Sequence, residues 1–164
     1  MDIFNLIREN NLSKIKDILK DIDNLNEIKS ESGESLLKFI IKNRCSFEVF
    51  KILVENGADF KEIDEEGVSL LDEAIKKRRV DIVKFLISKG IDPNETKRKS
   101  GFTPLMASVS YGDEEITRFL LSLGVDITKK DSYNFSAKNY AKMTGNRRFI
   151  KILEEYERGS VEKD

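Results

Sequence analysis

Three copies of one phrase, each bounded by two glycines, recur along this chain at a nearly constant spacing. The opening glycines are Gly33, Gly67 and Gly101, which lie 34 residues apart. The closing glycines stand at positions 57, 90 and 124, so their spacings are 33 and 34 residues. A period of about 20 to 50 residues indicates a stack of similar supersecondary units, in which each unit packs only against its neighbours. We therefore expect the chain to fold as a repeat array.

Each copy is expected to form two short helices and an extended hairpin. In the third copy, Thr103 can cap a first helix, and Pro104 suits the first turn because its missing N–H loses no hydrogen bond there. Apolar residues at positions 116, 119, 120 and 123 follow the i, i+3, i+4, i+7 pattern of a second helix with one buried face. Gly124 suits the left-handed residue that ends a helix.

Weaker copies flank the three clear ones. Asp23 replaces the closing glycine upstream, and Asn134 replaces the opening glycine downstream. Both outer copies carry polar residues at positions that are apolar in the inner copies, as terminal repeats require. We expect a single domain spanning residues 1–156, followed by a frayed tail at residues 157–164. Its five repeats are expected at about residues 1–29, 30–63, 64–96, 97–130 and 131–156.

The segment Gly101-Phe102-Thr103-Pro104-Leu105 and the ending Gly124-Val125-Asp126 resemble the ankyrin repeat, and the resemblance extends over nearly the whole chain. It implies an all-α fold, an ankyrin-repeat α-solenoid of five helix-turn-helix repeats joined by hairpin loops. A tetratricopeptide array shares the 34-residue period but joins its helices tightly on both sides, whereas one connector here is long and polar. The family's histidine is replaced at four positions, so we expect its hydrogen bonds to be missing: Lys38, Asp72, Met106 and Asn139.

The composition argues against catalysis. The chain has no histidine and one cysteine, Cys45, which rules out Ser-His and Cys-His pairs and zinc sites built from Cys and His. We predict no enzyme activity, no catalytic residue, no cofactor and no metal. With 29 basic and 30 acidic residues, the net charge of −1 provides no global field for nucleic acid or membranes. No apolar run approaches the ~20 residues of a membrane span, and no signal peptide is expected.

The resemblance also implies where a partner binds. In the family, residues beside the turn glycine form hairpin tips, and the end of each first helix completes a concave face. The corresponding residues here are charged in the first half and aromatic in the second. The aromatic half has the composition that is enriched in interface cores. The predicted partner-binding residues are Val68, Lys76, Lys77, Phe102, Tyr111, Tyr133, Phe135 and Met143. The alternative interpretation is that neighbouring tips pack on one another and that Phe135 only seals the last hairpin.

These observations favour a non-enzymatic protein–protein interaction module that binds an unidentified partner protein through its concave face and hairpin tips. The alternative is a regulatory or inhibitory masking subunit, or a secreted, host-directed effector built on the same scaffold. We expect a monomer located in the cytoplasm or elsewhere inside the cell, with export as an effector left open. The basic run at residues 76–79 has three further interpretations: a nuclear-localisation patch, a phosphate contact, or a solvated helix end with its turn.

Overall fold

The computed structural model describes residues 2–161, with side chains up to residue 159. These residues form ten α-helices and two 3-10 helices, and no strand is assigned within them. The hairpins contain only isolated bridges, Lys29 with Ser35 and Ile63 with Ser69. The expectation of an all-α fold with five helix pairs is confirmed. The elements are α1 (Ile3–Arg8), α2 (Leu12–Ile18), η1 (Leu19–Asp21), η2 (Leu25–Glu27), α3 (Leu36–Lys42), α4 (Phe47–Glu55), α5 (Leu70–Lys76), α6 (Val80–Ser88), α7 (Pro104–Ser110), α8 (Glu114–Ser122), α9 (Ala137–Met143) and α10 (Arg147–Val161).

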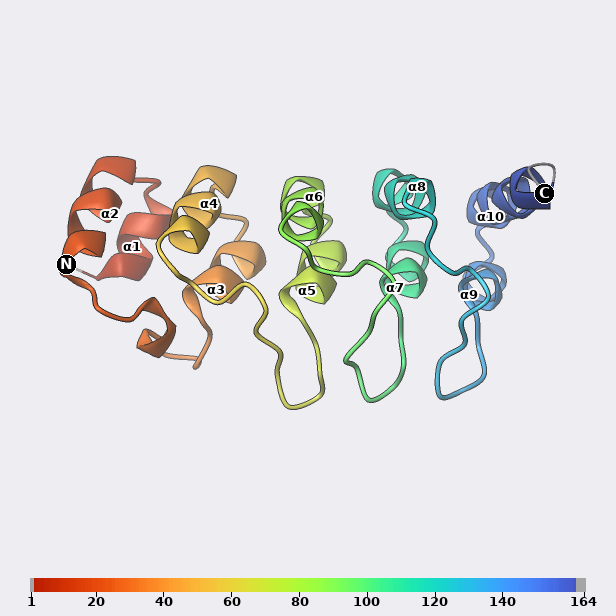
Figure 1. Ribbon diagram of the computed structural model, residues 1–164, viewed down its shortest axis with the longest axis horizontal. Helices are drawn as coiled ribbons and strands as arrows, with labels where there is room; N and C mark the ends of the chain where they lie inside the picture. The colour runs from red at the N-terminus through yellow and green to blue at the C-terminus, as the bar shows by residue number, and fades with distance from the viewer. Residues whose placement is uncertain (1, 162–164) are drawn as a thin grey trace. The chain divides into compact units, whose positions relative to one another are not determined.

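The chain divides into two compact units. Unit 1 is Met1–Glu62 and contains α1 to α4, and unit 2 is Ile63–Asp164 and contains α5 to α10. In unit 2 the first helices of the pairs, α5, α7 and α9, lie in one row and the second helices in another (Figure 1). Three hairpins project from the row of first helices. The boundary between the units, after Glu62, lies one residue before the expected end of the second repeat at position 63.

Side-chain caps explain where the first helices of unit 2 begin. The hydroxyls of Ser69, Thr103 and Ser136 each accept a hydrogen bond from the N–H three residues further on. The prediction that Thr103 caps a helix whose first residue is Pro104 is confirmed. Such a cap contributes about 1 kcal/mol of stability, because it satisfies an N–H that the helix itself leaves without a partner.

The expectation that hydrogen bonds are missing where histidine is replaced is wrong at two positions. Asp72 Oδ2 accepts from both the N–H and the hydroxyl of Ser69 at 2.9 Å. Asn139 Oδ1 accepts the corresponding pair from Ser136 at 2.8 Å. Both side chains are short and carry an acceptor oxygen, so they close a capping box. At Met106 the thioether sulfur lies 3.4 Å from Thr103 N, a weaker acceptor.

Residues with a left-handed backbone conformation interrupt the helices and turns at the same places in each repeat. The closing glycines at positions 57, 90 and 124 have φ of 93°, 99° and 76°, as predicted, and Asn134 replaces an opening glycine with φ of 64°. Where Asp23 replaces a closing glycine, α2 is instead followed by η1 and η2. The turn inside each helix pair also contains one left-handed residue. These are Asn10, Arg44, Arg78, Gly112 and Gly145.

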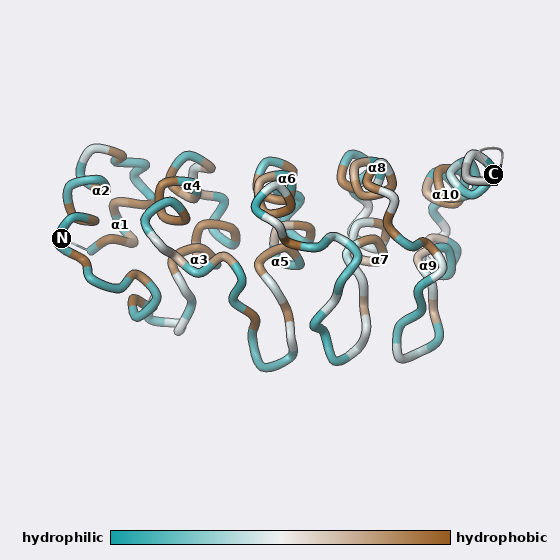
Figure 2. The backbone as a smooth tube through the Cα atoms, viewed as in Figure 1, coloured by the Kyte–Doolittle hydropathy of each residue, from teal (hydrophilic) through white to brown (hydrophobic). Residues whose placement is uncertain are grey.

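The hydrophobic residues lie mostly on the helices, while the hairpins are mostly polar (Figure 2). In unit 1, Leu6, Ile7, Ile15, Ile40 and Leu53 are at most 1% exposed. The inner stripe of unit 2 is equally buried at Ile75, Ile82, Leu86, Ile116 and Leu120. Because the cores lie between the helices, the hairpin side chains face solvent, one another or the first helices.

The last helix is longer than expected. α10 continues to Val161, although the frayed tail was expected from residue 157, and residues 162–164 lie outside the described residues. Lys138, which occupies an inward position in α9, lies 3.0 Å from Glu157 and 3.7 Å from Glu154. These ion pairs join α9 to α10 at positions 154 and 157.

Candidate functional site

The hairpins of unit 2 lie next to one another and are linked through their backbones (Figure 1). Lys99 N donates to Glu66 O at 3.2 Å, and Ser132 N donates to Ser100 O at 2.9 Å. The first of these contacts is close enough that a Cβ atom added to Gly67 would lie 1.9 Å from Lys97 O. The three hairpin tips therefore form one connected row.

An aspartate fixes the first and the last hairpin of this row. Asp64 Oδ1 accepts from Glu66 N at 3.0 Å and from Val68 N at 2.9 Å. Asp131 Oδ1 accepts from Tyr133 N and Phe135 N, both at 3.0 Å. The backbone of three predicted site residues, at positions 68, 133 and 135, is thus held by carboxylates at the start of each turn.

Asp131 has a further partner in α9. It is only 8% exposed, and the Tyr140 hydroxyl donates to its second oxygen, Oδ2. Burial acts to raise the pKa of Asp131, but the hydrogen bonds from the Tyr140 hydroxyl and from the N–H groups of Phe135 and Tyr133 outweigh it and hold the pKa below its ordinary value. Burial and the bond to Asp131 raise the pKa of Tyr140 to about 12.

The Tyr140 ring joins two of the predicted aromatic residues. Its centroid lies 5.2 Å from that of Phe102 and 5.9 Å from that of Phe135, both edge to face. Edge-to-face pairs at such distances are favourable because the positive ring edge meets the negative ring face. Phe102 and Phe135 are half-buried, so they lie against Tyr140 with only part of each ring open to solvent.

Arg98 extends this cluster to α5. Its guanidinium lies 5.1 Å from the Phe102 ring centroid, and its Nε lies 3.3 Å from Asp72 Oδ1 without the geometry of a hydrogen bond. Both side chains of the ion pair are largely buried, at 16% and 5% exposure. We call this connected set the Tyr140 network: Asp72, Arg98, Phe102, Asp131, Phe135 and Tyr140.

The remaining predicted residues lie outside these ring contacts. Tyr133 and Met143 are 71% and 64% exposed. Tyr111 is half-buried at the end of α7, where its carbonyl accepts from Arg78 Nη2 at 2.5 Å. Lys76 is exposed on the last turn of α5, and Lys77 is the half-buried residue that follows it. The structure thus brings Phe102 and Phe135 together at Tyr140 and presents Tyr133 and Met143 to solvent.

Sequence reasoning missed Tyr140 and Asp131, although both have a signal in the repeat pattern. Tyr140 lies four residues after the capping Ser136, just as Phe39 lies four residues after Ser35. Asp131 precedes the left-handed Asn134 by three residues, as Asp64 precedes Gly67. Comparing the repeats position by position, rather than only their apolar stripes, would have drawn attention to both.

Within the described residues, no group of three or more His, Cys, Asp or Glu side chains is placed to hold a metal ion. Nor does any helix in residues 2–161 have the length and apolar character needed to cross a membrane. What the hairpin row does offer is exposed apolar side chains on a backbone that hydrogen bonds hold in place. Such an arrangement is suited to contact with another macromolecule.

The pKa of Tyr140 can be tested directly. A tyrosine whose pKa is raised from 10 to about 12 on folding contributes stability below pH 10 that is lost as the pH rises toward 12. We expect the difference in absorbance at 295 nm between the wild type and Tyr140→Phe, measured by rapid mixing before the chain unfolds, to show a midpoint near pH 12. A midpoint near pH 10 would contradict the hydrogen bond to Asp131.

The sequence of this chain is similar to those of known ankyrin-repeat proteins. A family model described as "Ankyrin repeats (many copies)" matches residues 36–87 and 71–121. A putative ankyrin repeat protein of fowlpox virus is 30% identical over 154 residues, which cover 93% of this chain and 35% of the relative.

Two other relatives match shorter segments. A palmitoyltransferase of Homo sapiens is 39% identical over 95 residues, covering 58% of this chain and 15% of that protein. A putative ankyrin repeat protein of Rickettsia bellii is 38% identical over 98 residues, covering 57% of this chain and 11% of the relative. The chain thus spans only a minor part of the length of each of these relatives.

Proposed function

Because the chain belongs to the ankyrin-repeat family, we propose that it is a non-enzymatic module that binds a partner protein through the hairpins and first helices of unit 2. Ankyrin repeats generally mediate protein–protein interaction, which supports the class of function. The proposed binding face consists of the residues predicted from the sequence: Val68, Lys76, Lys77, Phe102, Tyr111, Tyr133, Phe135 and Met143.

Tyr133 is the observation that carries this proposal. Its side chain is 71% exposed, while its backbone N–H is bonded to the buried carboxylate of Asp131. An aromatic side chain on an ordered backbone loses little conformational entropy on binding, and tyrosine is common among residues that dominate binding energy. Met143, at the end of α9, adds a second exposed apolar side chain that can adapt to a partner's surface.

The other residues of the face have different roles in this proposal. Phe102 and Phe135 are half-buried against Tyr140, so they support the tip that carries Tyr133 more than they offer free surface. Lys76 is exposed and positively charged, and a charge at the edge of an interface mainly affects the association rate and the orientation of the partner. The anchors are therefore Tyr133 and Met143.

Two substitutions test the anchors. After a partner has been identified by affinity capture with the wild-type chain, we expect Tyr133→Ala and Met143→Ala each to weaken its binding about tenfold, since each removes a large apolar contact. Dissociation constants would be measured by isothermal titration calorimetry, with circular dichroism to verify the fold.

Leu123→Ala is the matched control. Leu123 is also an exposed apolar residue, at 45%, but it follows α8 in the row of second helices. Its replacement is expected to leave the affinity unchanged. Wild-type affinity in both anchor variants, or a loss confined to the Leu123 variant, would contradict the proposed face.

A further inference from the structure

The charged side chains beside the proposed binding face of unit 2 are not balanced. Four lysines belong to this face or lie next to its residues in the sequence, and in the described part of the chain none of their ammonium groups has an ion-pair or hydrogen-bond partner. They are Lys76, Lys77, Lys130 and Lys142. The first two lie at the end of α5, and the other two lie three residues before Tyr133 and directly before Met143.

The carboxylates of the unit 2 hairpins are mostly used within the unit. Glu66 lies 3.5 Å from Lys99 Nζ. Glu95 lies 3.0 Å from Lys97 Nζ. Four other carboxylates accept backbone N–H groups, namely those of Asp64, Asp92, Asp126 and Asp131. Among the hairpin carboxylates described in unit 2, only that of Glu65 is exposed without a partner. Four free ammonium groups against one free carboxylate leave a surplus of three positive charges.

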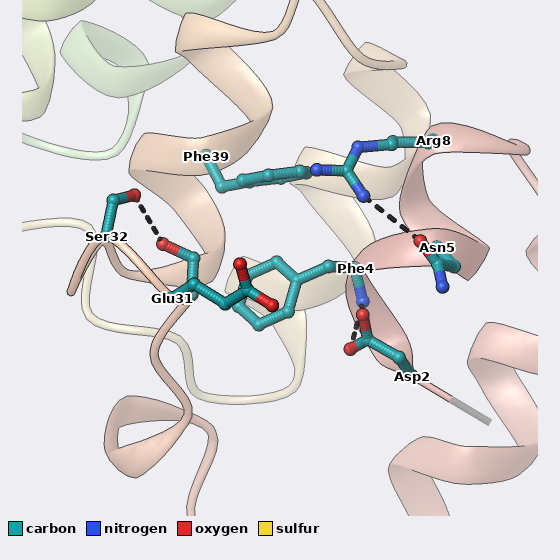
Figure 3. Close-up of a pocket in the computed structure, with 8 residues that line it drawn as sticks. Asp2, Phe4, Asn5, Arg8, Glu31, Ser32 and Phe39 are labelled. Carbon is teal, nitrogen blue, oxygen red and sulfur yellow. Dashed lines mark hydrogen bonds between the residues drawn. The ribbon is translucent and has the colours of Figure 1, made fainter.

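The same helix position in unit 1 also carries cations, but these have partners. Three first helices end in a cation, namely Arg8, Lys42 and Lys76. The ammonium group of Lys42 forms an ion pair with Glu34. The guanidinium of Arg8 lies 4.8 Å from the Phe39 centroid, and its Nη1 donates to Asn5 Oδ1 at 3.0 Å, beside a cavity of unit 1 (Figure 3). The cation that ends α5 has no such contact, so it is available to a ligand.

We propose that the partner segment bound by this face is an acidic stretch of polypeptide that also carries an apolar side chain, an inference that rests on the binding function proposed above. Its carboxylates would pair with the four free lysines, and its apolar side chain would lie against Tyr133 and Met143. Complementary charges of this kind speed association and fix the orientation of the partner. A basic segment would meet four like charges and a single free carboxylate, so the face would repel it.

A polypeptide fits this face better than a nucleic acid or an anionic membrane. The carboxylates of Glu65 and Glu66 are exposed at the tip of the first hairpin, in the same row as Tyr133. A nucleic acid carries a phosphate at every nucleotide, so its backbone would meet these carboxylates as well as the lysines. An acidic polypeptide can place aspartate or glutamate only where the lysines lie and present uncharged residues to the first hairpin.

Synthetic peptides test the charge preference without knowledge of the partner. The acidic probe is a blocked peptide of about ten residues made of glutamate and leucine, and the neutral and basic probes have glutamine or lysine in place of glutamate. In ¹⁵N–¹H NMR titrations of the full chain, we expect the acidic probe to shift the amide signals of Tyr133 and Met143 saturably. Its affinity should fall about fivefold or more between about 50 and 500 mM NaCl, because salt screens exposed charges. The neutral probe should bind about tenfold more weakly, and the basic probe should produce no saturable shift.

Three variants place the carboxylates of the probe at the lysines. Lys76→Gln/Lys77→Gln and Lys130→Gln/Lys142→Gln are each expected to weaken the acidic probe about fivefold, the combined size of two solvent-exposed ion pairs. Glu65→Gln should strengthen the binding about twofold, because it removes the free carboxylate that repels the probe. Circular dichroism would verify that each variant keeps its fold.

Lys84→Gln/Lys89→Gln is the matched control. It removes the same charge from α6, in the row of second helices, and should leave the affinity for the acidic probe unchanged. The proposal would be overturned by equal affinity for the acidic and neutral probes, by wild-type affinity in both lysine double variants, or by an equal loss in the control. Absence of a saturable shift, or tighter binding of an oligothymidylate or of phosphatidylserine vesicles, would overturn it as well. If a captured partner still loses affinity in Tyr133→Ala and Met143→Ala, the binding function stands although its charge preference fails.

Discussion

Replacing Gly67 by alanine is expected to lower the free energy of unfolding by about 4 kcal/mol. The new Cβ would lie 1.9 Å from Lys97 O and 2.5 Å from its carbonyl carbon, so the two hairpins would have to separate. Overpacking of this kind typically costs about 1 to 3 kcal/mol, and the left-handed φ of 77° adds about 1 to 2 kcal/mol for any residue with a Cβ. Urea denaturation followed by circular dichroism would measure the loss.

Two other opening glycines serve as controls that separate the two causes. Gly33 has a φ of 80° but nothing within 4 Å of an added Cβ, so Gly33→Ala should lose only about 1 to 2 kcal/mol. Gly101 is intermediate, because its Cβ would lie 3.3 Å from Asp131 Cα. An equal loss at positions 33 and 67 would show that backbone conformation alone, and not the contact between hairpins, requires glycine there.

Replacing Asp131 by alanine is expected to lower the free energy of unfolding by about 3 kcal/mol. The substitution removes the acceptor of the Tyr140 hydroxyl and of the Tyr133 and Phe135 N–H groups. Buried donors left without a partner lose the bond and also bear the cost of leaving water. Asp131→Asn keeps one acceptor oxygen in place, so we expect it to lose only about 1 kcal/mol.

The pH dependence of this effect has a definite sign. Because the folded pKa of Asp131 lies below the ordinary value of 3.8, its carboxylate contributes stability that is fully present above pH 3.8 and is lost as the pH falls through the folded pKa. The difference in unfolding free energy between the wild type and Asp131→Asn should therefore be constant from pH 7 to 5 and shrink in more acidic solution. A difference that grew on acidification would contradict an ionised Asp131 in the folded chain.

The helix pairs and their boundaries were predictable because each rests on local chemistry. The capping hydroxyl of Thr103, the first-turn Pro104 and the left-handed Gly124 act within a few residues of where they stand. The family membership followed from the same positions, because several copies in register are hard to produce by chance. Such local signals can be recognised in the sequence without knowledge of the contacts made by distant residues.

The details of the hairpin row depend on contacts between residues that are separated in the sequence, so they were harder to predict from the sequence. The buried pair of Asp131 and Tyr140 joins residues nine positions apart, and Arg98 reaches Asp72 across 26. The sequence predicts that Phe102 and Phe135 lie beside turns. It does not predict that both rings contact the ring of Tyr140. We propose Tyr133 and Met143 as the anchors because of their exposure, and exposure cannot be read from the sequence.

The left-handed residue inside each helix pair affects how the sequence of such a chain can change during evolution. The turn requires a left-handed backbone conformation, and Asn10, Arg44, Arg78, Gly112 and Gly145 all adopt it, so residues with and without a side chain are found there. Arg78 uses its side chain to reach the carbonyl of Tyr111 in the following repeat. A side chain at this point can therefore make a contact with the neighbouring repeat without a change in the core, at the cost of the left-handed backbone, about 1 to 2 kcal/mol.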